Sequence, residues 1–176
     1  MAKTESLKQI IVGCKKGDAD SFSQLLDIYA KRLYGYFYRL TGSKNDSDDL
    51  LGELFLKLVD KIRLFKGGTF ESWLFKIASN IFYDHLRGIQ KQRKLIVAQT
   101  EHIESKTTNP GKSESGNIDK LQSQLEKLDP DTKEVIFMRF YSELSFKEIA
   151  SMRSEPIGTT LSKAHRGLKK LRELME

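Results

Sequence analysis

Apolar residues in the first half of the chain recur at the spacing of an α-helix. Leu7, Ile10, Ile11 and Cys14 fall at positions i, i+3, i+4 and i+7, which places them on one helix face. The same spacing predicts a second helix that ends near residue 40, a third around residues 46–58 and a fourth that begins near residue 70. The positions expected to be buried in the third and fourth helices are Leu50, Leu51, Leu54, Phe55 and Leu58, then Trp73, Leu74, Ile77, Ala78, Ile81 and Phe82.

Short polar segments separate these helices. Gly17 and Asp18 are suited to end the first helix and cap the second, because glycine adopts left-handed backbone angles and aspartate accepts from helix N–H groups. The second helix is expected to close at residues 41–42, and residues 66–69 break the chain before the fourth helix. The candidate caps of the third helix are Asn45, Asp46 and Ser47.

Residues 97–117 differ in composition from both halves of the chain. The run AQTEHIESKTTNPGKSESGN within them is rich in Ser, Thr, Asn and Gly and nearly free of apolar residues, which is typical of a linker. No alternating pattern of β-strands persists anywhere. The sequence therefore predicts an all-α protein of two small helical domains, at residues 1–96 and 118–176, joined by this flexible linker.

The second domain carries the pattern of a helix-turn-helix. A helix around Leu121, Leu125 and Leu128 is followed by Asp129 and Pro130, a cap and a proline that start the next helix. Residues 145–148 form a capping box ahead of a short helix at 146–152, and a longer helix begins at residue 156. A short helix, a tight turn and a longer helix at the end of a three-helix unit are typical of a DNA-binding domain. The buried side of the last helix is expected to hold Leu161, Leu168, Leu171 and Leu174.

The charge of the chain favours a polyanionic partner. The net charge is +6 over 176 residues, and the excess lies in residues 1–95, with 17 Lys and Arg against 11 Asp and Glu. Nucleic acid and an anionic membrane surface both fit a basic chain. A single cysteine, Cys14, leaves no disulfide within the chain, and no apolar run is long enough to span a membrane. These features predict a cytoplasmic protein.

Three groups of residues are candidates for function. The first is acidic: Asp46, Asp48, Asp49 and Glu53 gather at the start of the third helix. Carboxylates near a helix N-terminus are also favoured by the helix dipole, so from the residues alone simple stabilisation of the helix end is the favoured explanation. The alternative is a docking patch for a basic partner.

The second group surrounds the glycine-rich break at residues 65–69. Aromatic rings and cations next to a flexible loop suit single-stranded DNA, because rings stack on bases and cations meet phosphates. Asn80, Asp84 and Arg87 recur at i, i+4 and i+7 and form a polar stripe on the fourth helix. A core role for Trp73 and Phe82, with the stripe as a solvated face, is the competing interpretation.

The third group lies at the start of the last helix, where hydroxyls and backbone N–H groups suit a phosphate. Lys163 and Arg166 are three residues apart, so a recognition helix could direct both into a major groove. An ordinary amphipathic helix with solvated charges explains the same pattern. The three histidines lie apart in the predicted fold, and no zinc spacing, P-loop, dinucleotide fingerprint or nucleophile elbow is present, so no metal, cofactor or catalytic residue is expected.

Several of these residues carry a resemblance to a known family. The runs Asp48-Asp49-Leu-Leu-Gly-Glu53, Phe70-Glu-Ser-Trp73-Leu74 with Asn80, and Asp84-His85-Leu86-Arg87 resemble region 2 of the extracytoplasmic-function (ECF) group of bacterial sigma-70 factors. Leu125-Glu-Lys-Leu128, Glu148-Ile149-Ala150, Pro156-Ile-Gly158-Thr159 and Arg166 resemble region 4 of the same group. Together the two sets cover nearly the whole chain.

The resemblance implies a transcription initiation factor, not an enzyme, whose partners are core RNA polymerase, promoter DNA in duplex and single-stranded form, and an anti-sigma factor. It implies contacts with the β′ clamp helices and the β flap of the polymerase. By position, the clamp helices meet Asp48, Asp49 and Glu53. The −10 element meets Phe65, Lys66, Gly67, Gly68 and Thr69, with Asn80, Asp84 and Arg87 beside them, and the −35 element meets Gly158, Thr159, Thr160, Ser162, Lys163 and Arg166.

The chain departs from the family in the turn of region 4. The family usually has an apolar residue, a glycine and another apolar residue where this chain has Arg153, Ser154 and Glu155. Burying Arg153 and Glu155 without partners would be costly, and Gly167 inside a helix costs up to about 1 kcal/mol relative to alanine. These departures predict a less stable C-terminal domain or a reshaped turn.

Two other functions fit parts of the sequence. A stand-alone helix-turn-helix regulator would bind duplex DNA without polymerase and would leave the acidic patch and the glycine loop without a role. A helical adaptor would bind only protein and would lack salt-dependent affinity for DNA.

Overall fold

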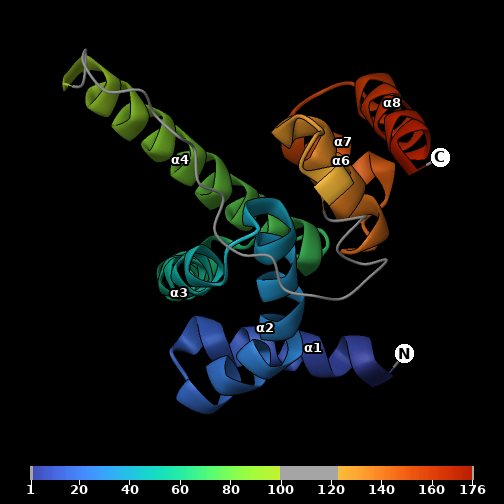
Figure 1. The fold of residues 1–176 in the computed structure, drawn as a ribbon. Helices are drawn as coiled ribbons and strands as arrows, with labels where there is room; N and C mark the ends of the chain where they lie inside the picture. Colours follow the sequence, from blue (N-terminus) through green and yellow to red (C-terminus); the bar gives the residue numbers. More distant parts are fainter. Residues whose placement is uncertain (1, 100–122, 176) are drawn as a thin grey trace.

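A computed structural model describes residues 2–99 and 123–175, and every regular element in these two ranges is helical (Figure 1). The all-α fold class is therefore confirmed for the part of the chain that the structure covers. None of the helices in these ranges is both long enough and apolar enough to cross a membrane. The elements in chain order are α1 (Ala2–Lys16), α2 (Ala19–Thr41), α3 (Lys44–Lys61), the 3-10 turn η1 (Ile62–Leu64), α4 (Phe70–Gln99), α6 (Pro130–Phe140), α7 (Phe146–Arg153) and α8 (Ile157–Met175).

The N-terminal domain is a bundle of α1 to α4 around one apolar core. Ile10, Ile11 and Cys14 are buried as the helical spacing predicts. The middle of the core is aromatic, since Tyr36 packs edge-on against Phe37 and Phe75. In Figure 1, α4 projects from the bundle as the longest helix.

Local signals place the helix ends. The Asp18 carboxylate accepts from the Ser21 N–H at 2.8 Å, and Gly42 ends α2 in the left-handed conformation with φ 71°. The cap of α3 differs from the expectation: Ser43, and none of Asn45, Asp46 and Ser47, is the N-cap, because α3 begins at Lys44. The Ser43 hydroxyl accepts from the Asp46 N–H.

Helix α4 extends to Gln99, which is three residues into the range predicted for the linker. The rest of that range, and Leu121 with it, lies outside the described residues. Leu125 and Leu128, which the sequence places on the same helix as Leu121, are buried.

The C-terminal domain has the expected starts of its helices. Asp129 caps α6 with Pro130 at its first position, and Ser145 and Glu148 form the capping box of α7. The predicted buried face of α8 is only partly right: Leu171 is buried, but Leu161 and Leu168 are 44% and 41% exposed. The buried face instead consists of Thr160, Ala164, Gly167 and Leu171.

Close packing of α8 on α6 explains this register. A Cβ on Gly167 would lie 2.5 Å from Thr132 Cγ2 and 2.6 Å from Ile136 Cδ1, so only glycine fits there without displacement of its neighbours. Small side chains let two helix backbones approach, and the leucines are left on the outer side. The two domains also touch each other, through α2 with α6 and α4 with α7 (Figure 1).

Candidate functional site

One face of α3 is acidic and open to solvent. Asp48, Asp49 and Glu53 are all exposed, and Glu53 forms an ion pair with Lys57 at 2.6 Å. Two apolar side chains share the exposed surface of this helix, Leu56 at 73% and Val59 at 54%. A surface that combines carboxylates with exposed apolar groups is suited to bind a basic protein surface.

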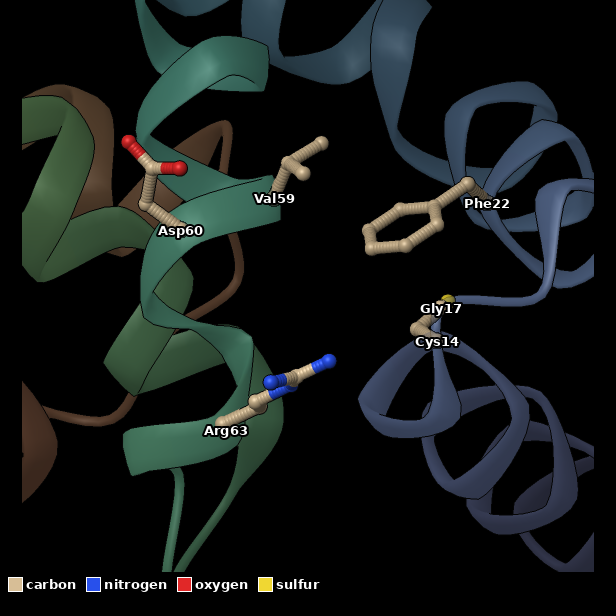
Figure 2. A pocket seen from close by; sticks show the side chains of 6 residues that line it. All are labelled: Cys14, Gly17, Phe22, Val59, Asp60 and Arg63. Atoms are coloured by element: carbon tan, nitrogen blue, oxygen red, sulfur yellow. The ribbon is translucent and has the colours of Figure 1, made fainter.

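A pocket of about 290 Å³ lies between this helix and the junction of α1 with α2 (Figure 2). Phe22 and Val59 face one another across it, and the Arg63 side chain points into the gap. Arg63 Nε also donates to the Lys15 carbonyl at 3.2 Å, which ties η1 to the end of α1. Across residues 2–99 and 123–175, no cluster of three or more His, Cys, Asp or Glu side chains could hold a metal ion.

The loop between η1 and α4 is held at its base and open at its tip. Lys15 Nζ donates to the Phe65 carbonyl at 2.5 Å and lies 5.4 Å from the centre of the Phe65 ring. That ring packs against Phe70 and Trp73, each with ring centroids 5.4 Å away. Beyond this anchor, Lys66, Gly67, Gly68 and Thr69 are exposed.

Both glycines of this loop have backbone angles that favour glycine, with φ 150° at Gly67 and φ 85° at Gly68. A larger residue at either position would be strained, and no neighbouring atom would meet a Cβ there. The loop therefore presents an accessible backbone next to Lys66, and Phe65 is the ring that anchors it.

The polar stripe of α4 is formed as the spacing predicts. Asn80, Asp84 and Arg87 are exposed, and Arg87 bonds Asp84 at 2.6 Å. The opposite side of the helix carries Leu74, Ala78 and Ile81 into the core. The competing view of Trp73 and Phe82 as core residues fits Phe82, which is 2% exposed, whereas Trp73 is only partly buried beside the loop.

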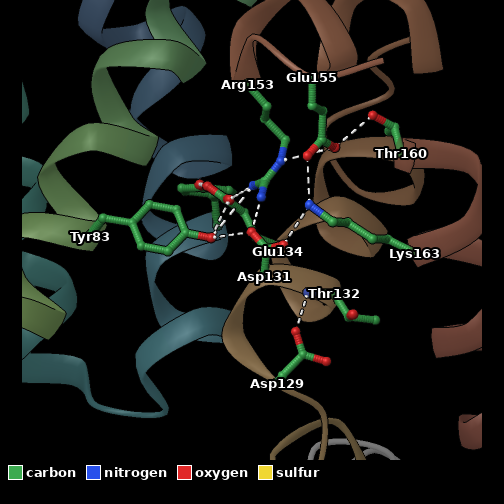
Figure 3. Close-up of polar contacts among 10 residues, drawn as sticks. Tyr83, Asp129, Asp131, Thr132, Glu134, Arg153, Glu155, Thr160 and Lys163 are labelled. Carbon is green, nitrogen blue, oxygen red and sulfur yellow. Dashed lines mark hydrogen bonds and ion pairs between the residues drawn. The ribbon is translucent and has the colours of Figure 1, made fainter. Parts of the chain in front are cut away.

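The turn between α7 and α8 contains a network of ion pairs (Figure 3). The Arg153 guanidinium binds the carboxylates of Asp131 and Glu134 and also approaches Glu155 at 3.4 Å. Lys163 Nζ bridges Asp131 at 2.6 Å and Glu155 at 2.5 Å. Arg153 and Glu155 are thus paired with charged neighbours, and of the three guanidinium nitrogens of Arg153 only Nε is buried without a hydrogen bond, so neither side chain is buried without a partner.

The backbone of this turn also keeps the conformation that glycine usually provides. Ser154 is left-handed, with φ 54°, and its N–H returns to the end of α7. The turn is therefore not reshaped, although a non-glycine residue adopts this conformation at some cost.

The candidate −35 residues fall into two sets. Gly158, Thr159, Ser162 and Arg166 are exposed on the first turns of α8. Thr160 is buried and donates to Glu155 at 2.7 Å, and Lys163 belongs to the ion-pair network. Contact of DNA with Thr160 or Lys163 stays a prediction. It requires each of these side chains to leave its partner within the protein and bind DNA instead.

Hydrogen bonding sets the charge of two acids in this domain. Partial burial acts to raise the pKa of Glu155, but bonds from Lys163 and Thr160 and the charge of Arg153 lower it. Burial likewise opposes ionisation of Glu148, yet bonds from Ser145, Thr69 and Ser72 lower its pKa to about 2. Both carboxylates are ionised at neutral pH.

Sequence reasoning missed some residues of these surfaces. Leu56 and Val59 escaped notice because the search for a buried stripe on α3 disregards apolar residues on the outer face. Lys15 lies fifty residues from Phe65, so nothing in the local sequence indicates their bond.

Comparison with protein families identifies both halves of the chain. Residues 25–92 match the family model described as Sigma-70 region 2, and residues 118–171 match Sigma-70, region 4. The first match contains the acidic face of α3, the loop and the stripe of α4. The second contains the turn and most of α8.

Curated relatives and a solved structure agree with these matches. The chain is 30% identical to the RNA polymerase sigma factor CarQ of Myxococcus xanthus, over 92% of each chain. It is 29% identical to the ECF RNA polymerase sigma factor SigE of Mycolicibacterium smegmatis, over 88% of this chain but only 62% of that longer protein. The sigma factor RpoE of Bartonella quintana, solved with the anti-sigma factor NepR, superimposes with a TM-score of 0.72 at 26% identity, over 89% of this chain and 98% of that one. The chain therefore belongs to the ECF group of the sigma-70 family, the non-enzymatic factors that bind core RNA polymerase and direct it to promoters, which favours this reading over a stand-alone regulator.

Proposed function

We propose that this sigma factor docks on the β′ clamp helices of core polymerase through Asp48, Asp49 and Glu53 on α3. The observation that carries the proposal is the exposure of these three carboxylates beside Leu56 and Val59. Apolar contact supplies binding energy, and the charges select a basic partner and its orientation.

The loop at residues 65–69 captures an unstacked base of the −10 element. Extrusion of a base from a duplex costs a few kcal/mol, so a shaped site with cationic neighbours must offset that cost. Lys66 supplies an exposed cation at the loop, and Asn80 and Arg87 lie exposed on α4. The loop backbone at Gly67 and Gly68 leaves room for a base to approach. The protein drives melting by binding, and the polymerase performs the chemistry.

The start of α8 reads the −35 element. Gly158, Thr159 and Ser162 offer backbone N–H groups and hydroxyls to a phosphate, and the exposed Arg166 reaches a base edge in the major groove. Lys163 joins them only when it leaves Asp131 and Glu155. Reading of the −35 element therefore depends on how readily the network of the turn opens.

An anti-sigma factor is the proposed regulator, because the superimposed RpoE structure holds one on a chain of the same fold. A factor that serves RNA polymerase acts where the chromosome is, so the proposed location is the cytoplasm.

Reconstitution with bacterial core RNA polymerase tests the proposal. Transcript starts on a fragmented genomic template are sequenced with and without the protein. Discrete starts that share an upstream motif are expected, and the motif identifies the promoter. If the polymerase binds the protein but the starts remain random, the assignments to α8 and the loop fail. If the protein does not bind polymerase, the docking assignment fails.

A further inference from the structure

The loop at residues 65–69 is bonded to the helices at both of its ends. The Phe65 N–H donates to a carbonyl of η1 at 3.1 Å, and the Thr69 carbonyl accepts from the first turn of α4 at 3.3 Å. Between these bonds lie Gly67 and Gly68, and glycine adopts many backbone conformations at little steric cost. The direction in which the loop leaves η1 therefore depends on the peptide group that follows Phe65.

Neighbouring rings fix the side chain of Phe65. It packs with Phe70 and Trp73, and Tyr29 of α2 extends this cluster, with its ring centroid 5.7 Å from that of Phe70. Tyr29 Oη also donates to the Glu71 carboxylate at 2.7 Å, which joins the cluster to α4. These contacts hold the ring of Phe65, but they do not fix the peptide group that follows it.

That peptide group is held from α1. Lys15 Nζ donates to the Phe65 carbonyl at 2.5 Å and lies 5.4 Å from the centre of the Phe65 ring. A hydrogen bond from a charged donor is stronger than one between neutral groups, and a cation over a ring adds attraction. Lys15 thus contacts both the carbonyl and the ring of the residue from which the exposed loop begins.

Arg63 in turn holds the end of α1. Its Nε donates to the Lys15 carbonyl at 3.2 Å, and its side chain points across the gap between α3 and the junction of α1 with α2 (Figure 2). The Lys15 carbonyl lies in the last turn of α1, where carbonyl groups lack a partner within the helix. The two bonds run in opposite directions, so η1 fixes α1 through Arg63 and α1 fixes the loop through Lys15.

The helix that holds the loop lies before the segment matched to region 2. That match begins at residue 25, whereas α1 spans Ala2–Lys16. We propose that the end of α1 is a positioning element of the −10 loop, in which Arg63 fixes Lys15 and Lys15 orients the peptide group after Phe65. A loop that is already held in place loses less conformational entropy when DNA binds. The part of this proposal that concerns promoter melting rests on the proposed function.

Trp73 reports the position of the loop base without polymerase or DNA. It is the single tryptophan of the chain, it is partly buried, and its ring centroid lies 5.4 Å from that of Phe65. Quenching of its emission by acrylamide measures its accessibility in the full-length protein. The quenching constant should rise in Lys15→Ala and stay at the wild-type value in Lys16→Ala, which changes the adjacent exposed lysine.

Two substitutions of Arg63 separate its hydrogen bond from its charge. Arg63→Met removes every donor and keeps the length of the side chain. Arg63→Gln carries its amide nitrogen on the same carbon as the arginine Nε, so it keeps a donor for the Lys15 carbonyl without the charge. Quenching should rise in Arg63→Met and remain at the wild-type value in Arg63→Gln and in Lys61→Ala, an exposed cation at the end of α3. Unchanged quenching in Arg63→Met, or increased quenching in Arg63→Gln, overturns the positioning role.

Promoter melting by the reconstituted polymerase connects the position of the loop to function. A fluorescent adenine analogue in the −10 element should show melting reduced about threefold in Arg63→Met, as for the loss of one hydrogen bond, with polymerase affinity unchanged. Arg63→Gln should melt the promoter like the wild type. In a Lys15→Ala background, Arg63→Met should cause little further loss, because the side chain on which Arg63 acts is absent.

The outcomes separate this proposal from the proposed function. Independent losses in the double variant, or weaker polymerase binding by Arg63→Met, assign Arg63 to a direct contact and overturn its action through Lys15. Increased quenching together with wild-type melting overturns the role of α1 in melting. A wild-type protein that binds polymerase but melts no promoter refutes the proposed function, and the quenching of Trp73 still decides whether α1 holds the loop.

Discussion

The two domains use their charged residues in opposite ways. On α3 of the N-terminal domain, Asp48 and Asp49 are exposed on the surface proposed to meet polymerase. At the turn of the C-terminal domain, Arg153, Glu155 and Lys163 are occupied with each other and with the acids of α6. The same residue types thus form a binding surface in one place and an internal scaffold in the other. Whether a charge is exposed on a helix face or enclosed between helices decides which role it serves.

The largest expected effect on binding is on the exposed face. Asp49→Lys reverses a charge where no buried group is disturbed, so the fold survives while affinity for core polymerase falls at least about a hundredfold, as for a like charge placed in an interface. Native gel or fluorescence titration with core polymerase measures it. Asp27→Lys, the same change at an exposed acid of α2, is the control and should bind normally. Tight binding by Asp49→Lys would contradict the docking assignment.

Breaking the internal network should instead lower stability. Arg153→Ala leaves the fully buried Glu134 carboxylate without its cation, and loss of one partner of a buried pair costs about 3–5 kcal/mol. Chemical denaturation monitored by circular dichroism gives the free energy of unfolding. Lys147→Ala, at an exposed position of α7, serves as the reference. Equal stability of the two variants would mean that the network is dispensable.

The anchored loop should show a smaller effect than either of these surfaces. Lys15→Ala removes the bond to the Phe65 carbonyl and the contact with its ring, so the loop loses its position but not its exposed residues. We expect about a tenfold loss in −10 melting, comparable to the effect of losing one charge-assisted hydrogen bond. A fluorescent adenine analogue in the promoter reports melting, and polymerase affinity should be unchanged. Lys16→Ala, at the adjacent exposed residue, should melt the promoter like the wild type.

Gly167→Ala tests whether helix propensity or overpacking has the larger effect on the free energy of unfolding at α8. Helix propensity alone favours alanine by up to about 1 kcal/mol, but overpacking against Thr132 and Ile136 costs about 1–3 kcal/mol. Thermal or denaturant unfolding should show net destabilisation of about 1 kcal/mol. Gly88→Ala, with open space around it, should be stabilised slightly. A more stable Gly167→Ala protein would show that α6 and α8 can move apart at little cost.

The smallest effect is a gain. Ser154→Gly relieves a left-handed non-glycine residue and should stabilise the protein by less than about 1 kcal/mol, without any change in the ion pairs. Precise denaturant titration can detect this difference. Ser151→Gly, inside α7 and exposed, should be destabilising by a similar amount. A destabilised Ser154→Gly variant would indicate that the serine makes a contribution beyond its backbone angles.

The helices could be predicted from the sequence because their signals are local. Spacing of apolar residues on α1 and the caps at Asp18, Asp129 and Ser145 each depend on residues within one or two turns. The register of α8 could not be predicted in this way. Leu161 and Leu168 look like core residues in the sequence, but α6 approaches α8 so closely at Gly167 that the buried face holds small side chains and the leucines face outward. The pairing of Arg153 could not be predicted for a related reason, since its partners Asp131 and Glu134 lie about twenty residues away along the chain.

The helical class and the two motif sets that indicate a sigma factor follow from the order of residues, because helix periodicity, capping and family motifs are properties of short segments. The packing of the helices in three dimensions sets which charges are exposed and which are enclosed in ion pairs, and it brings Lys15 to the loop at Phe65. It also decided that Glu134 meets Tyr36 and Tyr83 across two domains. These contacts join residues up to 98 positions apart, and their energies depend on burial and distance, which the order of residues does not specify.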